Sequence, residues 1–242
     1  MRLSRIHTDR ALAVAETVRL DEPASHYLAR VLRLSAGDPV VLFNGDGIDY
    51  TGEIVDAHHK GVTVLLSGSR DPANESPLRI TLVQAISRGE RMDYCLQKAT
   101  ELGVVCLQPM LSRRVEVRLD KKREAKRLAH WQAVVVSACE QSGRAAVPEV
   151  LPPLQMPEWL IGESDGQRLV LDPESKTKLT DIRLENDSAA ILVGPEGGFT
   201  NEELDQAKAS GVAAVSLGPR VLRTESAGPA AIAILQSMAG DL

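Results

Sequence analysis

The sequence predicts an α/β protein in which a mostly parallel sheet domain follows a small β-barrel. From residue 80 onward, short apolar runs alternate with helical segments, which is typical of a parallel sheet covered by helices on both faces. Residues 1–70 instead contain mainly strand signals separated by turns. A polar segment with two prolines lies between the two patterns. We therefore expect a β-barrel domain at residues 1–70, a linker at 71–79 and an α/β domain at 80–242.

Turn signals define the N-terminal strands. An apolar run at residues 40–43 ends in Asn44-Gly45-Asp46-Gly47, and residues 48–55 then alternate before a further run at 62–66. Between the early strands, one helix is expected at residues 22–34. Its apolar face would comprise Tyr27, Leu28, Val31 and Leu32. A small barrel with one embedded helix fits this pattern.

The α/β domain is expected to begin with a strand at residues 80–86 and a helix at 91–102, which Gly103 terminates. Thr200 and Glu203 form a capping box at the start of a later helix. The remaining expected elements are strands at 104–107, 169–171, 190–193 and 213–217 and a long helix at 121–139.

Composition favours a globular cytoplasmic protein, because 43% of the residues are hydrophobic and 25% are charged. No apolar run reaches membrane-spanning length, and the N-terminus lacks a secretory signal. The three cysteines form no CxxC pair, so we expect reduced, buried thiols. The five histidines show no metal-binding spacing, and no metal is expected.

Charge is unevenly distributed along the chain. Residues 1–144 contain 21 Lys and Arg against 18 Asp and Glu, whereas residues 145–242 contain 7 against 15. The sharpest basic stretch lies at residues 113–127, and further arginines are scattered over the first 33 residues. Such patches are consistent with phosphate binding, although a solvated helix face explains residues 121–127 equally well.

Two glycine-bearing loops stand out near the C-terminus. Residues 194–200 follow the strand at 190–193, and residues 217–225 follow the strand at 213–217. We expect both loops side by side at the carboxyl ends of neighbouring parallel strands, where open α/β sheets bind ligands. The alternative is a pair of tight turns that only stabilise the sheet.

The loops do not match the common nucleotide motifs. Neither is a Walker A loop or a GxGxxG turn, and Glu196 disfavours an anionic phosphate. S-adenosylmethionine fits better, because it carries a sulfonium cation and an adenine that backbone groups can bind.

Several motifs in order give a specific resemblance. The chain contains VGPEGGFTNEE at 193–203, LGPRVLRTESA at 217–227, SRGERMD at 87–93, QKATELG at 97–103 and ACEQSGR at 138–144. Together with the Arg-rich N-terminal β segment, these resemble the bacterial 16S ribosomal RNA (uracil-N3)-methyltransferase family of the SPOUT superfamily. The resemblance covers essentially the whole chain.

The resemblance implies a fold, a cofactor and an assembly. It implies an N-terminal PUA-like β-barrel that binds RNA, a C-terminal α/β domain with a deep trefoil knot, and a homodimer that acts on 16S rRNA in the 30S subunit. The apolar face of the last helix, with Ala230, Ile232, Ile234, Leu235 and Met238, fits either a dimer interface or the core. The cofactor S-adenosylmethionine would be held by Leu171, Asp172, Gly194, Pro195, Glu196, Gly197, Gly198, Leu217, Gly218, Pro219, Arg220, Leu222 and Thr224.

Methylation at N3 of uracil has defined chemical needs. N3 must lose its proton, and the negative charge on the two carbonyl oxygens must be stabilised. Arginine suits the second role, and Arg88, Arg144 and Arg223 are the candidates. The base would be Glu140, Glu225 or water. Each of these side chains has a structural alternative, as a phosphate contact, an ion pair or a helix cap.

The target base must leave its stack, so basic residues should position the RNA through its phosphates. The candidates are Arg2, Arg5, Arg30, Arg33, Arg113 and Arg114. Three alternatives stay open at this stage: a SPOUT enzyme that methylates a ribose 2′-hydroxyl or a tRNA base, a non-catalytic RNA-binding assembly factor, and a nucleotide-binding protein unrelated to RNA.

Overall fold

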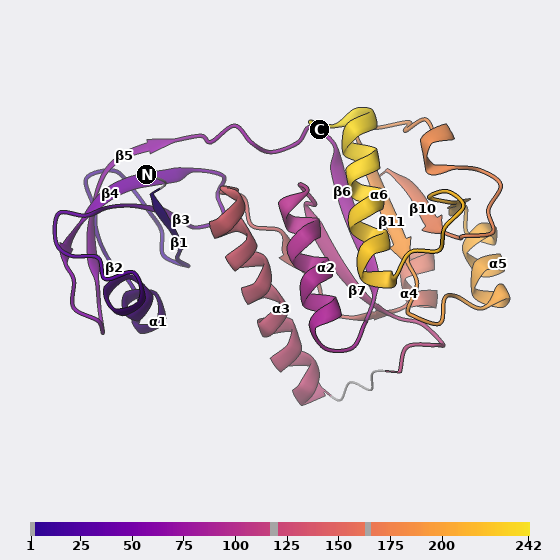
Figure 1. Ribbon diagram of the computed structural model, residues 1–242, viewed down its shortest axis with the longest axis horizontal. Helices are drawn as coiled ribbons and strands as arrows, with labels where there is room; N and C mark the ends of the chain where they lie inside the picture. Colours follow the sequence, from indigo (N-terminus) through magenta and orange to yellow (C-terminus); the bar gives the residue numbers. More distant parts are fainter. Residues whose placement is uncertain (1–2, 117–120, 163–165) are drawn as a thin grey trace. The chain divides into compact units, whose positions relative to one another are not determined.

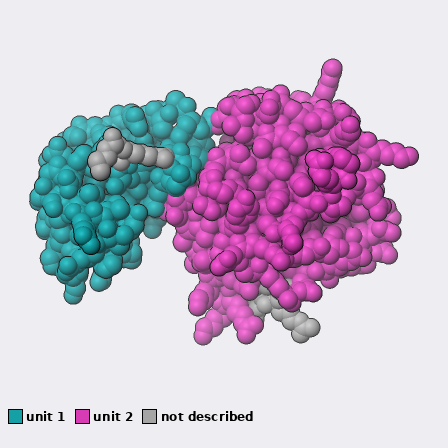
Figure 2. Space-filling view, in the orientation of Figure 1, with its two compact units in different colours: residues 1–75, 139–147 teal, residues 76–138, 148–242 magenta. Residues whose placement is uncertain are grey.

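A computed structural model describes residues 3–116, 121–162 and 166–242 (Figure 1). The chain forms two compact units, coloured separately in Figure 2. Unit 1 comprises residues 1–75 and 139–147, and unit 2 comprises residues 76–138 and 148–242. The fold class expected from the sequence, a small β domain followed by an α/β domain with a parallel sheet, is confirmed.

Unit 1 is built on a five-stranded sheet. Its strands pair in the order β1-β3-β4-β5-β2, with β1 parallel to β3 and the other pairs antiparallel. Alternate side chains from these strands, such as Ile6, Leu42 and Val64, meet in one apolar core. The strands are β1 (Ser4–His7), β2 (Thr17–Arg19), β3 (Pro39–Phe43), β4 (Asp49–Asp56) and β5 (Thr63–Arg70).

The expected helix at 22–34 is shorter and changes type. It consists of α1 (Glu22–His26), capped by the Asp21 side chain, followed by the π-helix η1 (Tyr27–Val31). The predicted apolar face was wrong, because only Leu28 is buried, while Tyr27 is 44% and Val31 58% exposed. A π-helix has a wider turn than an α-helix, so the 3.6-residue spacing does not hold there.

Unit 2 contains a parallel sheet with the order β12-β10-β11-β6-β7-β8, and β9 also pairs with β7. Every pair in this sheet is parallel. Val, Ile, Leu and Ala dominate its central strands, as expected where both faces are covered. The strands are β6 (Arg79–Ala85), β7 (Cys106–Leu111), β8 (Glu149–Val150), β9 (Leu154–Gln155), β10 (Gln167–Leu171), β11 (Ser188–Val193) and β12 (Ala213–Val215).

Helices cover both faces of this sheet. Figure 1 shows α2 (Glu90–Glu101) and α6 (Thr224–Ala239) side by side, and α6 contacts β6 and β11. The opposite face of β6, with Val83 and Ala85, packs with Met156 of α4 (Met156–Ile161) and Ala207 of α5 (Asn201–Ala209). The remaining helices are α3 (Lys121–Ser142), whose last residues belong to unit 1, and the 3₁₀ turn η2 (Leu179–Asp181).

Two predicted helix boundaries are confirmed. Gly103, at φ +85°, follows the end of α2. The Glu203 N–H donates to Thr200 Oγ1 over 3.2 Å, and the Thr200 N–H donates to Glu203 Oε2 over 2.9 Å, which completes the capping box of α5. Among the described residues, no helix is long and apolar enough to cross a membrane, and no group of His, Cys, Asp and Glu side chains could hold a metal ion.

Candidate functional site

The carboxyl ends of three parallel strands form the candidate site in unit 2. Strand β10 lies between β12 and β11, so β11 and β12 are not direct neighbours as the sequence suggested. The chain leaves β11, passes through α5 and reaches β12 on the far side of β10. As a result, the loop after β10 joins the two glycine-bearing loops at the same edge of the sheet.

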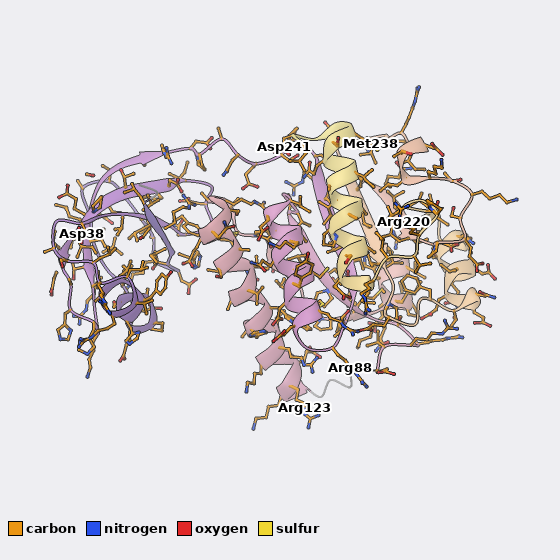
Figure 3. All side chains as sticks on the ribbon, viewed as in Figure 1. Asp38, Arg88, Arg123, Arg220, Met238 and Asp241 are labelled. Carbon is orange, nitrogen blue, oxygen red and sulfur yellow. The ribbon has the colours of Figure 1, made fainter. Side chains whose placement is uncertain are left out.

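These three loops surround a cavity of about 890 Å³. Residues 171–174 line it at the end of β10, residues 193–196, 198 and 199 at the end of β11, and residues 215–218 and 220–225 between β12 and the first turn of α6. The volume lies within the range of about 300–1,000 Å³ that is common for small-molecule sites. Figure 3 labels Arg220 in the last of these loops.

Glycine suits the place where the first loop closes on itself. A Cβ on Gly194 would lie 3.1 Å from Cε2 of the Phe199 ring, which is closer than side chains normally pack. Gly198, at φ +68°, donates from its N–H to the carbonyl oxygen of Pro195 over 2.8 Å. The loop is therefore a tight turn at the edge of the cavity.

Two arginines from other segments of the chain bind this loop. Arg114 Nη1 donates to the carbonyl oxygen of Gly197 over 2.6 Å. Arg91 Nη1 donates to Glu196 Oε1 over 3.0 Å. Both arginines also line the cavity. Neither was predicted to contact the ligand from the sequence, where Arg91 was read as a helix start and Arg114 as an RNA contact.

A carboxylate faces Arg91 from the first turn of α6. Arg91 Nε lies 4.0 Å from Glu225 Oε1. The second oxygen of Glu225, Oε2, is buried and has no hydrogen-bond partner among the described residues. A buried acceptor without a partner costs free energy unless a ligand group satisfies it. The cavity lining thus contains a cationic donor, Arg91, beside the carboxylate of Glu225, one of whose oxygens has no partner among the described residues.

The structure brings most of the predicted cofactor residues together. Of the thirteen named, all except Gly197 and Pro219 line the cavity, and two of the predicted catalytic residues, Arg223 and Glu225, line it with them. Gly197 contributes to the loop through the carbonyl oxygen that Arg114 binds. Cavity-lining residues that were not predicted include Pro173, Glu174, Phe199, Asn201, Leu204 and Ser216.

The other three predicted catalytic residues do not line this cavity. Arg88 is an exposed side chain, labelled in Figure 3, that pairs with Glu116 over 2.7 Å. Arg144 belongs to unit 1, where its buried guanidinium donates to both carboxylate oxygens of Glu75. The Arg144 side chain is 5% exposed and that of Glu75 is 34% exposed, so this ion pair is buried on the arginine side only.

Glu140 also belongs to unit 1, and its carboxylate accepts a 3.0 Å hydrogen bond from the N–H of His7. Burial raises the pKa of Glu140, against the opposing effects of that hydrogen bond and of the Arg5 charge. The motif at residues 138–144 therefore supplies partners for the β domain.

The predicted RNA contacts differ in exposure. Arg30, Arg33, Arg113 and Arg114 are exposed, and Arg2 lies outside the described residues. Arg5 is a correction, because its side chain is only 7% exposed and is paired with the fully buried Asp49. It also donates to the carbonyl oxygen of Arg144 over 2.9 Å. A side chain buried in this way is not available to a phosphate.

Comparison with known proteins identifies both parts of the chain. Residues 74–236 match the model of an RNA methyltransferase domain, and residues 20–67 match that of an RNA methyltransferase PUA domain. The β domain of unit 1 is therefore PUA-like, as expected.

Similar proteins share the whole length of the chain. Ribosomal RNA small subunit methyltransferase E of Buchnera aphidicola subsp. Schizaphis graminum is 31% identical over 100% of this chain and 98% of its own. The solved structure of the protein of that name from Neisseria gonorrhoeae, bound to S-adenosyl methionine, is 41% identical with a TM-score of 0.93 and covers 100% of both chains. A structure from Legionella pneumophila with bound cofactor SAM is 36% identical with a TM-score of 0.97, again over 100% of both chains.

Proposed function

This chain belongs to the ribosomal RNA small subunit methyltransferase E family, and we propose that the atom it methylates is N3 of a uridine. As a member of that family it is a methyltransferase that acts on 16S ribosomal RNA with S-adenosylmethionine as the methyl donor. We further propose that the cavity in unit 2 holds this donor and that the exposed arginines named above hold the RNA.

The residues of the cavity suit S-adenosylmethionine. Charged side chains of both signs line it, and S-adenosylmethionine likewise carries both, as a sulfonium, an ammonium and a carboxylate. They are Asp172, Glu174, Glu196 and Glu225 together with Arg91, Arg114, Arg220 and Arg223. Apolar side chains such as Leu171 and Leu222 provide walls for an adenine, and the backbone of the loops offers donors and acceptors. When bound, S-adenosylmethionine supplies a methyl group activated by its positively charged sulfur.

Uracil presents a carbonyl oxygen, an N3–H donor and a second carbonyl oxygen along one edge. The guanidinium of Arg91 can donate to a carbonyl oxygen, and the carboxylate of Glu225, whose side chain is 16% exposed, can accept the N3 proton. Arg91 would then stabilise the negative charge that develops on the base, with Arg223 as a second cation at the cavity. The carboxylate of Glu225, which lies 4.0 Å from Arg91 Nε at the cavity, is the observation that carries the proposal.

The same pair disfavours cytosine. At neutral pH, N3 of cytosine has no proton to give, and its amino group would face the donor Arg91 instead of a carbonyl oxygen. Such a mismatch leaves buried polar groups unpaired, which discriminates strongly between similar substrates. Uridine is therefore the pyrimidine that this site favours.

Exposed arginines of both units are proposed to contact RNA phosphates. Arg30 and Arg33 belong to unit 1, and Arg113 belongs to unit 2. Because the substrate is ribosomal, we propose a cytoplasmic location and the 30S subunit as the form that is methylated. Arg5 is not among the proposed RNA contacts, because its side chain is buried and paired with Asp49.

We propose that the enzyme is a homodimer through the outer face of α6. Ile232 and Leu235 are part of the core, whereas Ala230 and Ile234 are half-buried and Met238, labelled in Figure 3, is 41% exposed. These last three form an apolar stripe at four-residue spacing, as helix interfaces do. Light scattering of the purified protein tests this, and a monomer at micromolar concentration would contradict it.

The chemical proposal is tested with Glu225→Gln and Arg91→Met, and with Arg88→Met as the control. At saturating RNA and S-adenosylmethionine, loss of a general base or of an oxyanion donor lowers turnover by about 10²–10³-fold. Arg88→Met should leave the formation of 3-methyluridine within about twofold, since surface substitutions have small effects. Unchanged turnover in Glu225→Gln would remove this residue as the base.

A further inference from the structure

A buried amide lies behind the candidate site. Gln84, near the end of β6, is only 1% exposed. It lies outside the set of cavity-lining residues. A glutamine among apolar neighbours is unusual unless all its polar atoms are bound, since an unpaired buried amide is costly.

Every polar atom of this amide is used. Gln84 Nε2 donates to the carbonyl oxygen of Ala85 over 3.1 Å and to Thr224 Oγ1 over 2.9 Å. Gln84 Oε1 accepts from the Cys95 thiol over 3.3 Å. Because a backbone carbonyl can only accept, the atom that faces Ala85 must be the nitrogen, which fixes the orientation of the amide.

The amide holds the hydroxyl that makes the next hydrogen bond, whose direction follows from its carbonyl acceptor. The hydroxyl of Thr224 accepts from Gln84, and it donates its single hydrogen to the carbonyl oxygen of Gly194 over 2.6 Å. The amide thus links β6 to the first residue of α6 and, through it, to the glycine loop after β11. Thr224 is itself 6% exposed and lines the cavity.

Close packing keeps these groups in place. A Cβ on Gly228 of α6 would lie 3.2 Å from Gln84 Oε1 and 3.1 Å from Cδ1 of Leu82. The absence of a side chain at Gly228 therefore lets the first turns of α6 approach β6 closely enough for Thr224 to reach the amide. Alternating residues of β6 face α6 here, as expected for a strand.

We propose that Gln84 is a positioning residue of the cofactor site, which acts through Thr224. Because the hydroxyl hydrogen of Thr224 is already donated to the carbonyl oxygen of Gly194, this hydroxyl can only accept a hydrogen bond from a ligand. It therefore selects a ligand N–H or O–H group at that point, and S-adenosylmethionine carries both. The same bond holds the Gly194 loop against α6. This inference rests on the proposed cofactor site, but it is independent of which RNA atom is methylated.

The test measures S-adenosylmethionine affinity by calorimetry on the protein without RNA. Thr224→Val and Gln84→Met should each weaken binding about five- to tenfold, the usual effect of one hydrogen bond. Thr224→Ser keeps the hydroxyl and should bind within about twofold of the parent. Cys95→Ala, which removes only the thiol donor to Gln84, is the matched control and should also bind within about twofold.

The double variant Gln84→Met with Thr224→Val decides whether Gln84 acts through Thr224. It should bind no more weakly than Thr224→Val alone, because the amide then has no hydroxyl to orient. Additive losses, or full affinity in folded Gln84→Met, would overturn the proposal. Melting curves identify folded variants, and Gln84→Leu replaces Gln84→Met in the same cycle if the latter does not fold. If the parent binds S-adenosylmethionine but methylates another RNA atom, the function proposal fails and this one stands.

Discussion

Arg114 Nη1 donates a 2.6 Å hydrogen bond to the carbonyl oxygen of Gly197, 83 positions further along the chain. The same nitrogen lies 3.4 Å from the carbonyl oxygen of Phe199. One side chain from the segment after β7 thereby fixes two carbonyl groups of the glycine loop after β11. Hydrogen bonds to a charged donor are stronger than those between neutral groups, so this contact stabilises the loop shape.

Arg114→Ala should therefore weaken S-adenosylmethionine binding by about five- to tenfold. This is less than the 1.5–3 kcal/mol, about 12- to 160-fold, that a hydrogen bond to a charged group can contribute, because the loop keeps its other contacts. Calorimetry without RNA isolates this effect from any RNA contact. Arg113→Ala removes an adjacent, exposed arginine that pairs with Glu202 over 3.5 Å, and it serves as the control. Equal affinity in both variants would show that the contact does not shape the loop.

The packing of Phe199 against Gly194 leads to a second prediction. Gly194→Ala would place a methyl group 3.1 Å from the ring and should destabilise the protein by about 1–3 kcal/mol. Gly162→Ala is the matched control, because Gly162 has φ −70° and the added Cβ would meet nothing closer than 3.5 Å. Chemical denaturation measures both variants. Similar stability of the two proteins would contradict the packing argument.

The buried ion pair of Arg5 with Asp49 predicts that Arg5 contributes to the stability of the protein and not to RNA binding. Arg5→Met leaves the carboxylate of Asp49 buried with only the 3.5 Å contact to Arg70, and it should cost about 3–5 kcal/mol of unfolding free energy. Arg30→Met changes an exposed side chain and should cost less than about 0.5 kcal/mol. If Arg5→Met were as stable as the parent, Arg5 would return to the list of RNA contacts.

RNA binding should depend steeply on salt, whereas S-adenosylmethionine binding should not. Each phosphate contact contributes about −0.7 to −0.9 to the slope of log K against log salt. Arg30→Met should therefore reduce the magnitude of the slope by about 0.7 to 0.9, the contribution of one phosphate contact. Filter binding at several salt concentrations gives the slope. A slope near zero for the parent protein would contradict the phosphate-contact model.

Thiol reactivity tests the burial of the cysteines. Burial raises the pKa of Cys95 and of Cys139 to about 12 each, and it also raises the pKa of the half-buried Cys106. At pH 8 the thiols of the native protein should thus react slowly with a thiol reagent, while all three cysteines of the denatured chain should react rapidly. Rapid reaction of even one thiol in the native protein would show that a thiolate is accessible and would contradict the burial.

Local patterns were sufficient to predict much of the fold and of the cavity. Strand-length apolar runs and the glycines after them indicated β11 and its loop, and Thr200 with Glu203 identified the start of α5. These signals depend on neighbours in sequence, which is why they can be read from the chain alone. The trefoil knot that the resemblance implies stays a prediction.

What the sequence did not predict depends on contacts between distant segments. Spacing did not indicate that Arg144 pairs with Glu75 or that Glu140 accepts from the backbone of His7 in unit 1, and their part in catalysis stays a prediction. Arg91 was read from the sequence only as the start of a helix, and its 4.0 Å contact with Glu225 joins two segments more than 130 positions apart. The insertion of β10 between β11 and β12 is a property of sheet order, which spacing does not determine.

The most direct test of the account is nucleoside mass spectrometry of RNA incubated with the purified protein and deuterated-methyl S-adenosylmethionine. Free 16S RNA and assembled small subunits that lack the modification are treated in parallel. The account predicts labelled 3-methyluridine, with the assembled subunit as the better substrate. A labelled ribose, a labelled cytidine or a label on another atom of uracil would contradict the assignment of N3.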